Sequence, residues 1–403
     1  MLNVLVADRL PAAKVDELGQ LSGVTCDFQP DLTAEQLPEA IGSAHILCVR
    51  STRVNDATIT NGKNLMLIIR VGSGTNTIDV SAASERGIYV ANCPGKNAIA
   101  VAELTIGLLV GLDRRIPQAT ASLRDQKWEK KTYAKADGLK GKTIGIAGFG
   151  RIGQAVAQRA HAFEMDVIAY DLLLTPEEAE RLNVTYCDDL DELCRNSDIV
   201  SVHLPSTPET KGLFNAERFA LMKDGATFLN TSRGALHDQQ ALLEAMDSRN
   251  LRAGLDVFND EPAAGDKEYS HPILQHPHFI GTPHIGASTQ QAQDAVASEA
   301  IRIIREFIDN GSVPNCINLQ QHTSDQIQLI VRHYNKVGVL ASVMERLRAH
   351  EINIEGMSNI IFKEGKAAVA TMELSHRPPN EVLAQLEALD DKILSVSLTD
   401  EPS

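Results

Sequence analysis

Three polar residues in the second half of the chain have side chains that could carry a hydride-transfer reaction. Arg233, Glu261 and His284 each follow a short segment predicted as a strand, in LNTSRG, LDVFNDEP and GTPHIG. Because parallel strands of one sheet end at the same edge, these residues can converge there. Such a set suits the oxidation of a 2-hydroxy acid. Arg233 can hold the carboxylate and polarise the reacting carbonyl, His284 can take or return the hydroxyl proton, and Glu261 can hydrogen-bond the far imidazole nitrogen.

Each of these residues also has an ordinary structural explanation. A strand-end arginine such as Arg233 is often part of a surface ion pair. Glu261, which precedes Pro262, could be a loop residue, and His284 could be a structural histidine. The catalytic interpretation therefore depends on finding a cofactor site in the same sheet.

Residues 142–171 (KTIGIAGFGRIGQAVAQRAHAFEMDVIAYD) predict such a site, with a strand, a glycine turn, a helix and a second strand. Gly148 lets the strand turn sharply, Gly150 lets the backbone approach a diphosphate, and Gly153 lets the helix pack close to the strand. Asp171 lies about 20 residues past the glycines, where a carboxylate accepts hydrogen bonds from a ribose and repels a 2′-phosphate. The pattern predicts NAD rather than NADP, and a structural turn in another α/β sheet is the alternative.

Length and composition exclude several classes of protein. A chain of 403 residues is long enough for two or three domains. A formal net charge of −15 argues against a general binder of nucleic acid or anionic membranes. The apolar segments are too short to span a bilayer, and MLNVLVADRL is unlike a signal peptide, so we expect a soluble cytoplasmic protein. Six scattered cysteines without zinc spacing predict reduced, mostly buried thiols and no metal site.

Short apolar strands alternate with helices over the first three quarters of the chain, which predicts an α/β fold with parallel sheets. The predicted strands are 3–7, 45–49, 67–71, 87–92, 143–147, 166–170, 199–204, 227–230, 252–256 and 279–281. The predicted helices are 12–18, 34–41, 97–114, 154–163 and 288–310, the last with Ser288 and Gln291 as a capping box and Gly311 as its stop. A hinge is predicted at 93–95 and an irregular crossover arm at 124–139.

Two strand ends in the first quarter carry polar or glycine-rich turns. Arg50 and Ser51 follow one strand, and residues 72–74 (GSG) follow the next. Backbone N–H groups in such turns can bind an anion, although ordinary turn chemistry explains them equally well.

The end of the chain has a different pattern. Residues 314–324 predict a linker, and the segment beyond it reads as strand, helix, strand, strand, helix, strand. That order is typical of a small ferredoxin-like sandwich.

Motifs along nearly the whole chain resemble those of the D-isomer-specific 2-hydroxyacid dehydrogenases. RVGSGTNTIDVSAASERGIYVANCPGKNAIAVAELTIGLL resembles the family's substrate loop and hinge, and KWEKKTYAKADGLKGKTIGIAGFGRIG its entry to the cofactor domain. HLPSTPETKGLFN, NTSRGALHD, AGLDVFNDEP and TPHIGAST resemble its later signatures. The resemblance implies a Rossmann-type NAD-binding domain at 94–283 and a flavodoxin-like substrate domain built from 1–93 and 284–316, both doubly wound parallel sheets.

The resemblance also assigns roles to individual residues. The implied catalytic residues are Arg233, Glu261 and His284. The implied cofactor contacts are Gly148, Gly150, Arg151, Ile152, Gly153, Asp171, Thr207, Thr231, Asp256 and Ala287. The implied substrate contacts are Arg50, Ser73, Gly74, Asn97 and Gln293.

Within the family, the motifs are similar to those of members that oxidise 3-phospho-D-glycerate to 3-phosphohydroxypyruvate with NAD, which opens phosphorylated L-serine synthesis. A phosphate needs a cationic pocket, for which Arg50 and Arg53 are candidates. Lys130 or Lys131 could reach a partner subunit, because the arm around Trp128 resembles a family dimer element and implies a homodimer or homotetramer.

Two other functions stay open. One is the reduction of hydroxypyruvate, glyoxylate or another small 2-oxo acid. The other is a non-enzymatic, NAD-sensing regulator, which the intact set of Arg233, Glu261 and His284 disfavours.

Residues 325–403 resemble an ACT domain, in which NKVGVLASV matches the first turn from strand to helix. The resemblance implies regulation, commonly feedback inhibition by L-serine, with His333, Asn335 and Asn353 at positions that contact the effector. Lys336 and Val337 stand where Arg-Pro is usual. A module that only mediates subunit pairing is the alternative.

Overall fold

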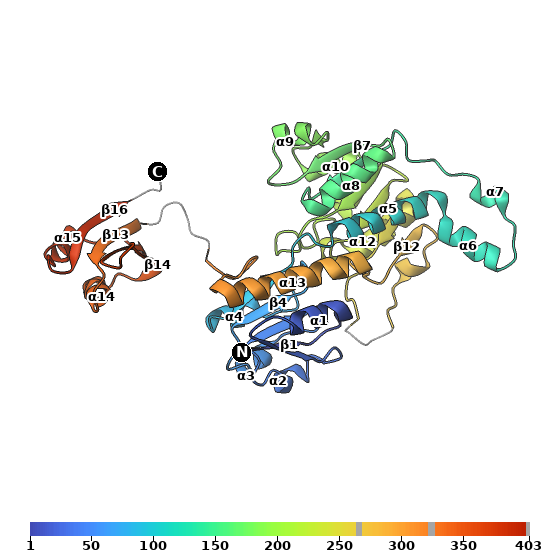
Figure 1. Ribbon diagram of the computed structural model, residues 1–403. Helices are drawn as coiled ribbons and strands as arrows, with labels where there is room; N and C mark the ends of the chain where they lie inside the picture. Colours follow the sequence, from blue (N-terminus) through green and yellow to red (C-terminus); the bar gives the residue numbers. More distant parts are fainter. Residues whose placement is uncertain (263–267, 321–326, 400–403) are drawn as a thin grey trace. The chain divides into compact units, whose positions relative to one another are not determined.

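The computed structural model describes residues 1–262, 268–320 and 327–399. The chain divides into two compact units, Met1–Asn318 and Leu319–Ser403 (Figure 1). Within the described residues, no helix has the length and hydropathy needed to cross a membrane.

The first unit contains two parallel sheets, and the N-terminal one has five strands in the order β2-β1-β3-β4-β5. Its strands are β1 (Leu2–Val6), β2 (Val24–Phe28), β3 (Ile46–Val49), β4 (Leu67–Arg70) and β5 (Tyr89–Asn92). All four residues of β3 are buried, as expected for a parallel strand covered on both faces. This strand order is the flavodoxin-like one, in agreement with the predicted fold class.

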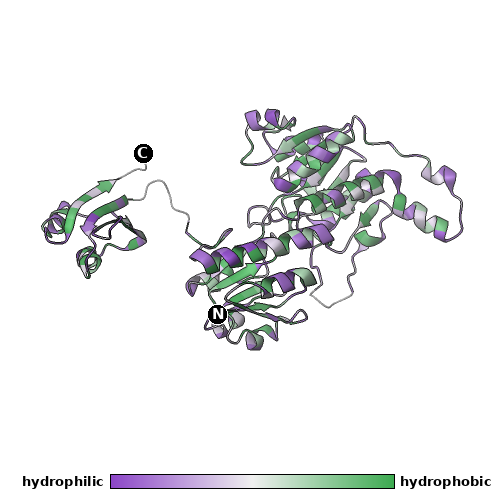
Figure 2. Ribbon diagram, viewed as in Figure 1, coloured by the Kyte–Doolittle hydropathy of each residue, from purple (hydrophilic) through white to green (hydrophobic). Residues whose placement is uncertain are grey.

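The second parallel sheet has seven strands in the order β12-β11-β10-β9-β6-β7-β8. Its strands are β6 (Thr143–Ala147), β7 (Asp166–Tyr170), β8 (Thr185–Tyr186), β9 (Ile199–Val202), β10 (Thr227–Asn230), β11 (Arg252–Leu255) and β12 (Phe279–Gly281). The order reverses between β6 and β9, which is where doubly wound sheets bind ligands. The predicted Rossmann-type sheet is thus confirmed, and Figure 2 shows that the strands of both parallel sheets are mainly hydrophobic.

Helices cover both faces of the N-terminal sheet. On one face, β1, β3 and β4 pack against α1 (Ala12–Gly19) and α13 (Gln290–Asn310). On the other face lie α2 (Leu37–Ala40), α3 (Asp56–Asn61) and α4 (Val80–Glu85). Because α13 follows the last strand of the second sheet, the chain returns to the sheet on which it began.

The second sheet is covered in the same way. One face packs against α5 (Ala98–Arg114), α8 (Arg151–Ala162) and α9 (Pro176–Arg181). The other packs against α10 (Leu190–Asn196), α11 (Ala216–Leu221) and α12 (Gln239–Arg249). Two short 3-10 helices, Gly234–Leu236 and Pro272–Gln275, follow β10 and precede β12. The arm consists of α6 (Ile116–Arg124) and α7 (Lys130–Tyr133), so the segment predicted as irregular contains one short helix.

The start of α13 differs from the prediction. Thr289, not Ser288, is the N-cap, because its extended backbone lets Oγ1 accept a hydrogen bond from Ala292 N at 3.2 Å. Ser288 N instead donates to Ile285 O at 2.8 Å and belongs to the preceding turn. The predicted stop is correct, since Gly311 ends the helix in a left-handed conformation with φ of 75°.

The beginning of the predicted linker is also part of the fold. Cys316 pairs with Ala91 in an antiparallel bridge, and the side chain of Asn318 accepts from Val90 N at 2.8 Å and donates to Ile88 O at 2.9 Å. These contacts with the backbone of 88–91 attach the segment to the edge strand β5. The remainder of the predicted linker, 321–324, lies outside the described residues.

The second unit has the predicted order of strands and helices. Its four-stranded antiparallel sheet, ordered β14-β15-β13-β16, consists of β13 (Ile327–Tyr334), β14 (Ile354–Ile361), β15 (Ala367–Leu374) and β16 (Ile393–Thr399). The helices α14 (Val339–Ala349) and α15 (Asn380–Glu387) pack on it through a small apolar core. The ferredoxin-like sandwich is therefore confirmed. Residues 325–326 and 400–403 of the predicted domain lie outside the described residues.

Most predicted elements of the first unit match the structure to within two residues. The helix predicted at 34–41 is only four residues long, Leu37–Ala40. Strand β2 was missed because only one of its five residues is buried, so it lacks the apolar run used to find the others.

Candidate active site

The glycine turn after β6 is built for close backbone approach. Gly148 has φ of 94°, and a Cβ placed there would lie 2.7 Å from the carbonyl carbon of His203, at the end of β9. A Cβ on Gly153 would lie 2.3 Å from Gly148 O, whereas one on Gly150 would meet no atom within 4 Å. The first and third glycines are therefore required by the fold, and the second leaves open space at the start of α8.

Asp171 holds this turn from the end of β7. Its Oδ2 accepts from Phe149 N at 2.7 Å and its Oδ1 accepts from Leu173 N at 2.9 Å. The side chain is partly exposed, so each oxygen keeps acceptor capacity for a ribose hydroxyl. The first N–H groups of α8 have no partner inside the helix. These residues fit an NAD-type dinucleotide, with its diphosphate at the helix start and its ribose at Asp171.

Glu261 and His284, which the sequence predicted as partners, form a direct pair. His284 Nδ1 lies 2.7 Å from Glu261 Oε2, and Phe258 N donates to Glu261 Oε1 at 3.0 Å. Burial on its own would raise the pKa of Glu261, but the hydrogen bond and charge of His284, with Phe258 N–H and Arg233, outweigh burial and lower it. The glutamate is thus held ionised beside the imidazole, which leaves Nε2 of His284 to exchange a proton.

Asp256 fixes the turn that carries His284. Its Oδ1 accepts from Thr282 Oγ1 at 2.6 Å and Ile285 N at 2.8 Å, and its Oδ2 accepts from Gly286 N at 2.8 Å. Burial raises the pKa of Asp256, and these three donors oppose that effect. His284 itself has φ of 51°, a left-handed conformation whose energetic cost must be offset by neighbouring contacts. Asp256, predicted to contact the nicotinamide, therefore has a positioning role that the sequence did not reveal.

Arg233 lies against the glycine turn that follows β4. A Cβ added to Gly74 would be 2.2 Å from Nη2 of Arg233, so only glycine leaves room for the guanidinium. Burial lowers the pKa of Arg233, and the charge of Glu261 opposes that shift. Arg233 is thus close enough to Glu261 to interact with it, and the three predicted catalytic residues are brought together.

Arg70, at the end of β4, is a functional candidate that sequence reasoning missed. Burial lowers its pKa to about 10, helped by the charges of Arg233 and Arg50 and opposed by Asp8. A Cβ on Gly72 would lie 1.3 Å from its Nη1, and its buried Nε has no hydrogen-bond partner within the described residues. Its position at a strand end, two residues before GSG, was the signal that could have found it.

The turn after β3 is filled by the chain itself. Asp8 Oδ2 accepts from the backbone N–H groups of Arg50, Ser51 and Thr52 at 2.7, 3.0 and 3.0 Å. The predicted anion nest there is therefore wrong as a ligand site, because its donors are already used. At 72–74, Gly72 N likewise donates to Arg70 O at 2.8 Å. Gly72 N is thus already used, whereas anion binding by the N–H groups of Ser73 and Gly74 stays a prediction.

Two predicted substrate contacts meet directly. Ser73 Oγ donates to Asn97 Oδ1 at 2.9 Å, and Asn97 is the N-cap residue of α5. Gln293 lies in the first turn of α13 and is half-buried. The Ser73–Asn97 bond thus joins the substrate loop to the beginning of the helix that leads into the second sheet.

The remaining predicted cofactor contacts lie at strand ends of the second sheet or at the beginning of α8. Thr231 is buried and its Oγ1 bonds Thr105 Oγ1 of α5 at 2.9 Å, and Thr207 N donates to Thr210 Oγ1 at 2.8 Å. Ile152 packs into the core between α5 and α8, and Ala287 follows the His284 turn. The contacts of these four residues with a cofactor stay predictions.

The predicted effector residues have different surroundings in the second unit. His333 is buried, with Nδ1 2.8 Å from Tyr334 O and Nε2 3.2 Å from Asn359 Oδ1. Asn335 and Asn353 are exposed, and the side chain of Asn335 donates to Gly365 O at 2.9 Å. The hydrogen bonds of these three residues go to other groups of the unit, so effector binding stays a prediction.

Comparison with known proteins identifies the family. Residues 106–286 match the NAD binding domain of D-isomer specific 2-hydroxyacid dehydrogenases. The hydroxypyruvate reductase of Thermotoga maritima is 45% identical over 280 residues, which is 68% of this chain and 89% of that protein. The chain belongs to the D-isomer-specific 2-hydroxyacid dehydrogenase family. It therefore carries this family's NAD-binding domain.

Other relatives of this dehydrogenase family are longer than the chain. The D-3-phosphoglycerate dehydrogenase of Methanocaldococcus jannaschii is 38% identical over 358 residues, covering 88% of this chain and 66% of that protein. The chain thus spans slightly less than two thirds of that relative. Among solved structures, the TT0316 protein of Thermus thermophilus is 35% identical with a TM-score of 0.70, covering 78% of this chain and all 100% of its own. The NAD⁺-bound 3-phosphoglycerate dehydrogenase of Entamoeba histolytica is 27% identical with a TM-score of 0.66, covering 79% of this chain and 99% of its own.

Proposed function

We propose that this chain oxidises 3-phospho-D-glycerate to 3-phosphohydroxypyruvate with NAD, the first step of phosphorylated L-serine synthesis, in the cytoplasm. The observation that carries the proposal is the cluster of Arg70 and Arg233 against the 72–74 turn, with Arg50 near enough to Arg70 to help lower its pKa, beside the pair of Glu261 and His284. A substrate with a carboxylate and a phosphate at its two ends would pair with such a cluster, since guanidinium groups bind both anions.

The chemistry follows from the roles of three residues. Arg233 binds the carboxylate and polarises the carbonyl that forms. His284 accepts the hydroxyl proton at Nε2 while a hydride leaves the carbon that bears this hydroxyl. Glu261 stabilises the resulting imidazolium. Bound NAD supplies the acceptor for that hydride.

Substituting Arg70 tests the substrate assignment. In Arg70→Met we expect KM for 3-phospho-D-glycerate to rise about 30-fold, or about 2 kcal/mol, while KM for D-glycerate changes less than about threefold. The control is Arg9→Met, whose guanidinium is on the surface and pairs with Asp31 at 2.7 Å. Equal losses with both acids in steady-state assays would contradict a phosphate-reading role.

A second candidate is the reduction of hydroxypyruvate or another small 2-oxo acid. It is favoured by the 45% identity to a hydroxypyruvate reductase, which is higher than the 38% to the Methanocaldococcus jannaschii relative. NADH consumption with hydroxypyruvate and no NADH formation from 3-phospho-D-glycerate would select this candidate.

We further propose that the chain forms a homodimer or homotetramer through its arm. Trp128 is 82% exposed and Leu123 55% exposed, and they line an apolar pocket of about 290 Å³ with Ala119, Tyr133 and Ala134. Apolar surface of this kind is typical of an interface. Trp128→Asp should shift the mass measured by light scattering to that of a smaller species, and an unchanged mass would contradict this interface.

Regulation is proposed for the C-terminal unit. We propose that residues 325–403 form an ACT domain. We also propose that the first unit divides into a substrate domain, 1–93 with 284–316, and an NAD-binding domain, 94–283. L-serine is the proposed effector, with His333, Asn335 and Asn353 as its contacts. Turnover of the full chain that falls on adding L-serine, and no longer falls in Asn353→Ala, would support this assignment. Turnover indifferent to L-serine would leave subunit pairing as the role of the unit.

A further inference from the structure

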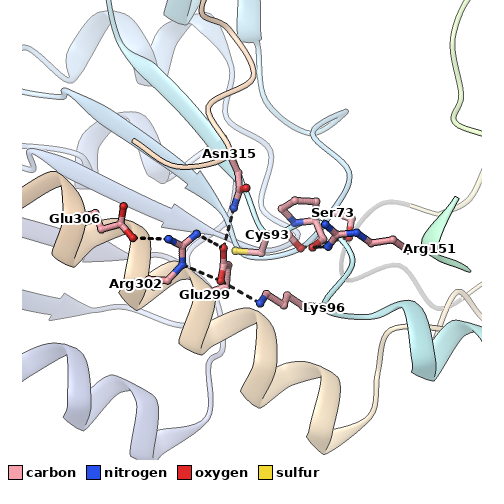
Figure 3. Close-up of polar contacts among 9 residues, drawn as sticks. Ser73, Cys93, Lys96, Arg151, Glu299, Arg302, Glu306 and Asn315 are labelled. Carbon is pink, nitrogen blue, oxygen red and sulfur yellow. Dashed lines mark hydrogen bonds and ion pairs between the residues drawn. The ribbon is translucent and has the colours of Figure 1, made fainter. Parts of the chain in front are cut away.

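The segment 93–97, which joins β5 to α5, is held from both sides. Lys96 Nζ lies 3.2 Å from Glu299 Oε2 of α13, and Arg151 Nη1 donates to Pro94 O at 3.0 Å (Figure 3). Gly95, between the two contacts, has φ of 75°. Two residues of the crossing, Pro94 and Lys96 on either side of Gly95, thus contact helices that cover different sheets of the first unit.

The contact on the side of the N-terminal sheet is made with a buried carboxylate. Glu299 is only 8% exposed and also accepts hydrogen bonds from Arg302 at 2.7 Å and Asn315 at 2.9 Å (Figure 3). The hydrogen bond from Arg302, followed by those from Asn315 and Lys96, outweighs burial and lowers the pKa of Glu299 to about 2. The carboxylate therefore stays charged, and Lys96 has a fixed partner on α13.

The contact on the other side comes from the cofactor turn. Arg151 is the first residue of α8, directly after Gly150, so its backbone N–H belongs to the helix start that fits a diphosphate. A Cβ on Gly95 would lie 2.3 Å from Cδ and from Nη1 of Arg151. The arginine side chain thus rests on Gly95 and could not do so if that residue had a side chain.

The segment that Arg151 holds leads directly to the predicted substrate contacts. Asn97 follows Lys96 and accepts from Ser73 Oγ at 2.9 Å, and Ser73 Oγ also lies 3.5 Å from Cys93 O. Pro94 therefore lies between the two residues, Cys93 and Asn97, that Ser73 Oγ contacts.

We propose that Arg151 is a positioning residue that couples the cofactor site to the substrate loop. Its backbone lies at the cofactor end and its side chain at the hinge carbonyl, so occupation of one site favours the arrangement of 94–97 that the other requires. Coupling of this kind is reciprocal: the acid tightens cofactor binding by the same factor as the cofactor tightens binding of the acid. The inference rests on the proposed function for the identity of the acid.

Fluorescence titration with NADH tests the coupling without turnover. NADH and 3-phospho-D-glycerate are both reduced, so they bind together but do not react. For the unaltered full chain, we expect saturating 3-phospho-D-glycerate to lower Kd for NADH at least about fivefold. The measured quantity is the ratio of Kd for NADH without the acid to Kd with it. This ratio should fall below about twofold in Arg151→Met, which lacks the donor to Pro94 O, and in Gly95→Ala, which displaces the side chain of Arg151.

The control is Arg159→Met on the same helix, because its guanidinium bonds Ala155 O and Glu103 rather than the hinge. It should keep the ratio of the unaltered chain. D-glycerate is titrated in parallel: if it alone changes NADH affinity, the proposed phosphorylated substrate is wrong and the variants are compared with D-glycerate.

The coupling proposal is overturned by either of two results. One is a variant Arg151→Met that weakens NADH binding equally with and without acid, so that the ratio is preserved. The other is an unaltered chain in which neither acid changes NADH affinity. Loss of the ratio in Gly95→Ala as well as in Arg151→Met supports it, since Gly95 has no predicted cofactor contact.

Discussion

The turns after β3 and after β6 each follow a strand that borders the point where the strand order of its parallel sheet reverses, and both are held by an aspartate from a neighbouring strand end. Asp8 gives one oxygen to three consecutive N–H groups, Arg50 to Thr52. Asp171 takes only Phe149 N from the turn after β6, together with Leu173 N of its own segment. The first turn is therefore closed and presents side chains, whereas the second leaves the start of α8 available for an anion.

The difference shows how one arrangement serves two purposes. A carboxylate that accepts hydrogen bonds from every donor of a turn makes the turn rigid. The backbone from which the side chain of Arg50 extends is therefore held in place. A carboxylate that satisfies one donor supports the turn while leaving the others free. Four substitutions test this account of the two turns and of a further carboxylate, Glu299.

The largest effect is expected from filling the open turn. Gly153→Ala places a Cβ 2.3 Å from Gly148 O, and backbone must move to accommodate it. We expect NADH affinity, measured by fluorescence titration, to fall about 100-fold, which corresponds to about 3 kcal/mol. Gly107→Ala in α5 is the control, because a Cβ there meets no atom within 4 Å. Unchanged affinity in Gly153→Ala would mean that the turn does not bind the cofactor.

Opening the closed turn should have the next largest effect. Asp8→Ala removes the acceptor of three N–H groups, and we expect a loss of about 2 kcal/mol in unfolding free energy with a KM for the acid raised about tenfold. Asp8→Asn keeps an acceptor oxygen, so it should recover part of the lost unfolding free energy and part of the affinity for the acid. Asp31→Ala, a surface carboxylate paired with Arg9, is the control for thermal melting and kinetics. A variant Asp8→Ala that loses stability but keeps KM would limit Asp8 to a structural role.

Removing the charge of Asp171 should separate its two roles. Asp171→Asn can still accept from Phe149 N but no longer repels a 2′-phosphate, so we expect the preference for NAD over NADP to fall about tenfold, or about 1.4 kcal/mol. The check is kcat/KM for both cofactors. Asp166→Asn, at the opposite end of β7, should leave the preference intact. If Asp171→Asn also keeps the preference for NAD over NADP, the carboxylate supports the turn and does not distinguish the two riboses.

The smallest effect concerns Glu299, a third carboxylate that fixes a chain crossing. Because the pKa of Glu299 is lowered from its ordinary 4.5 to about 2, its contribution to stability is complete above pH 4.5 and is lost as the pH falls towards 2. We expect Glu299→Gln to cost about 1 kcal/mol at pH 7 and to show a shallower loss of stability between pH 4.5 and 2. Parallel pH profiles of denaturant unfolding for the two proteins would refute this account.

Local sequence patterns were sufficient for most of the fold. Apolar runs of four or five residues located nearly every buried strand, because a strand of a covered parallel sheet is buried on both faces. The glycines at 148 and 153 also follow from local rules, since only glycine permits such close backbone contacts. The exposed edge strand β2 and the exact N-cap of α13 lie beyond these rules, because exposure and turn geometry leave no periodic signal.

Sequence patterns alone were sufficient to predict the fold class, the dinucleotide turn with Asp171, and the types of residue that could perform the chemistry. The folded arrangement was needed to show that Asp8 fills the turn at Arg50, that Asp256 secures the turn of His284, and that Arg70 belongs to the cationic cluster. Each of these contacts links residues that lie far apart in the chain or depends on burial among such residues. Short-range spacing cannot encode which strand ends become neighbours, because that depends on the order of strands in the folded sheets.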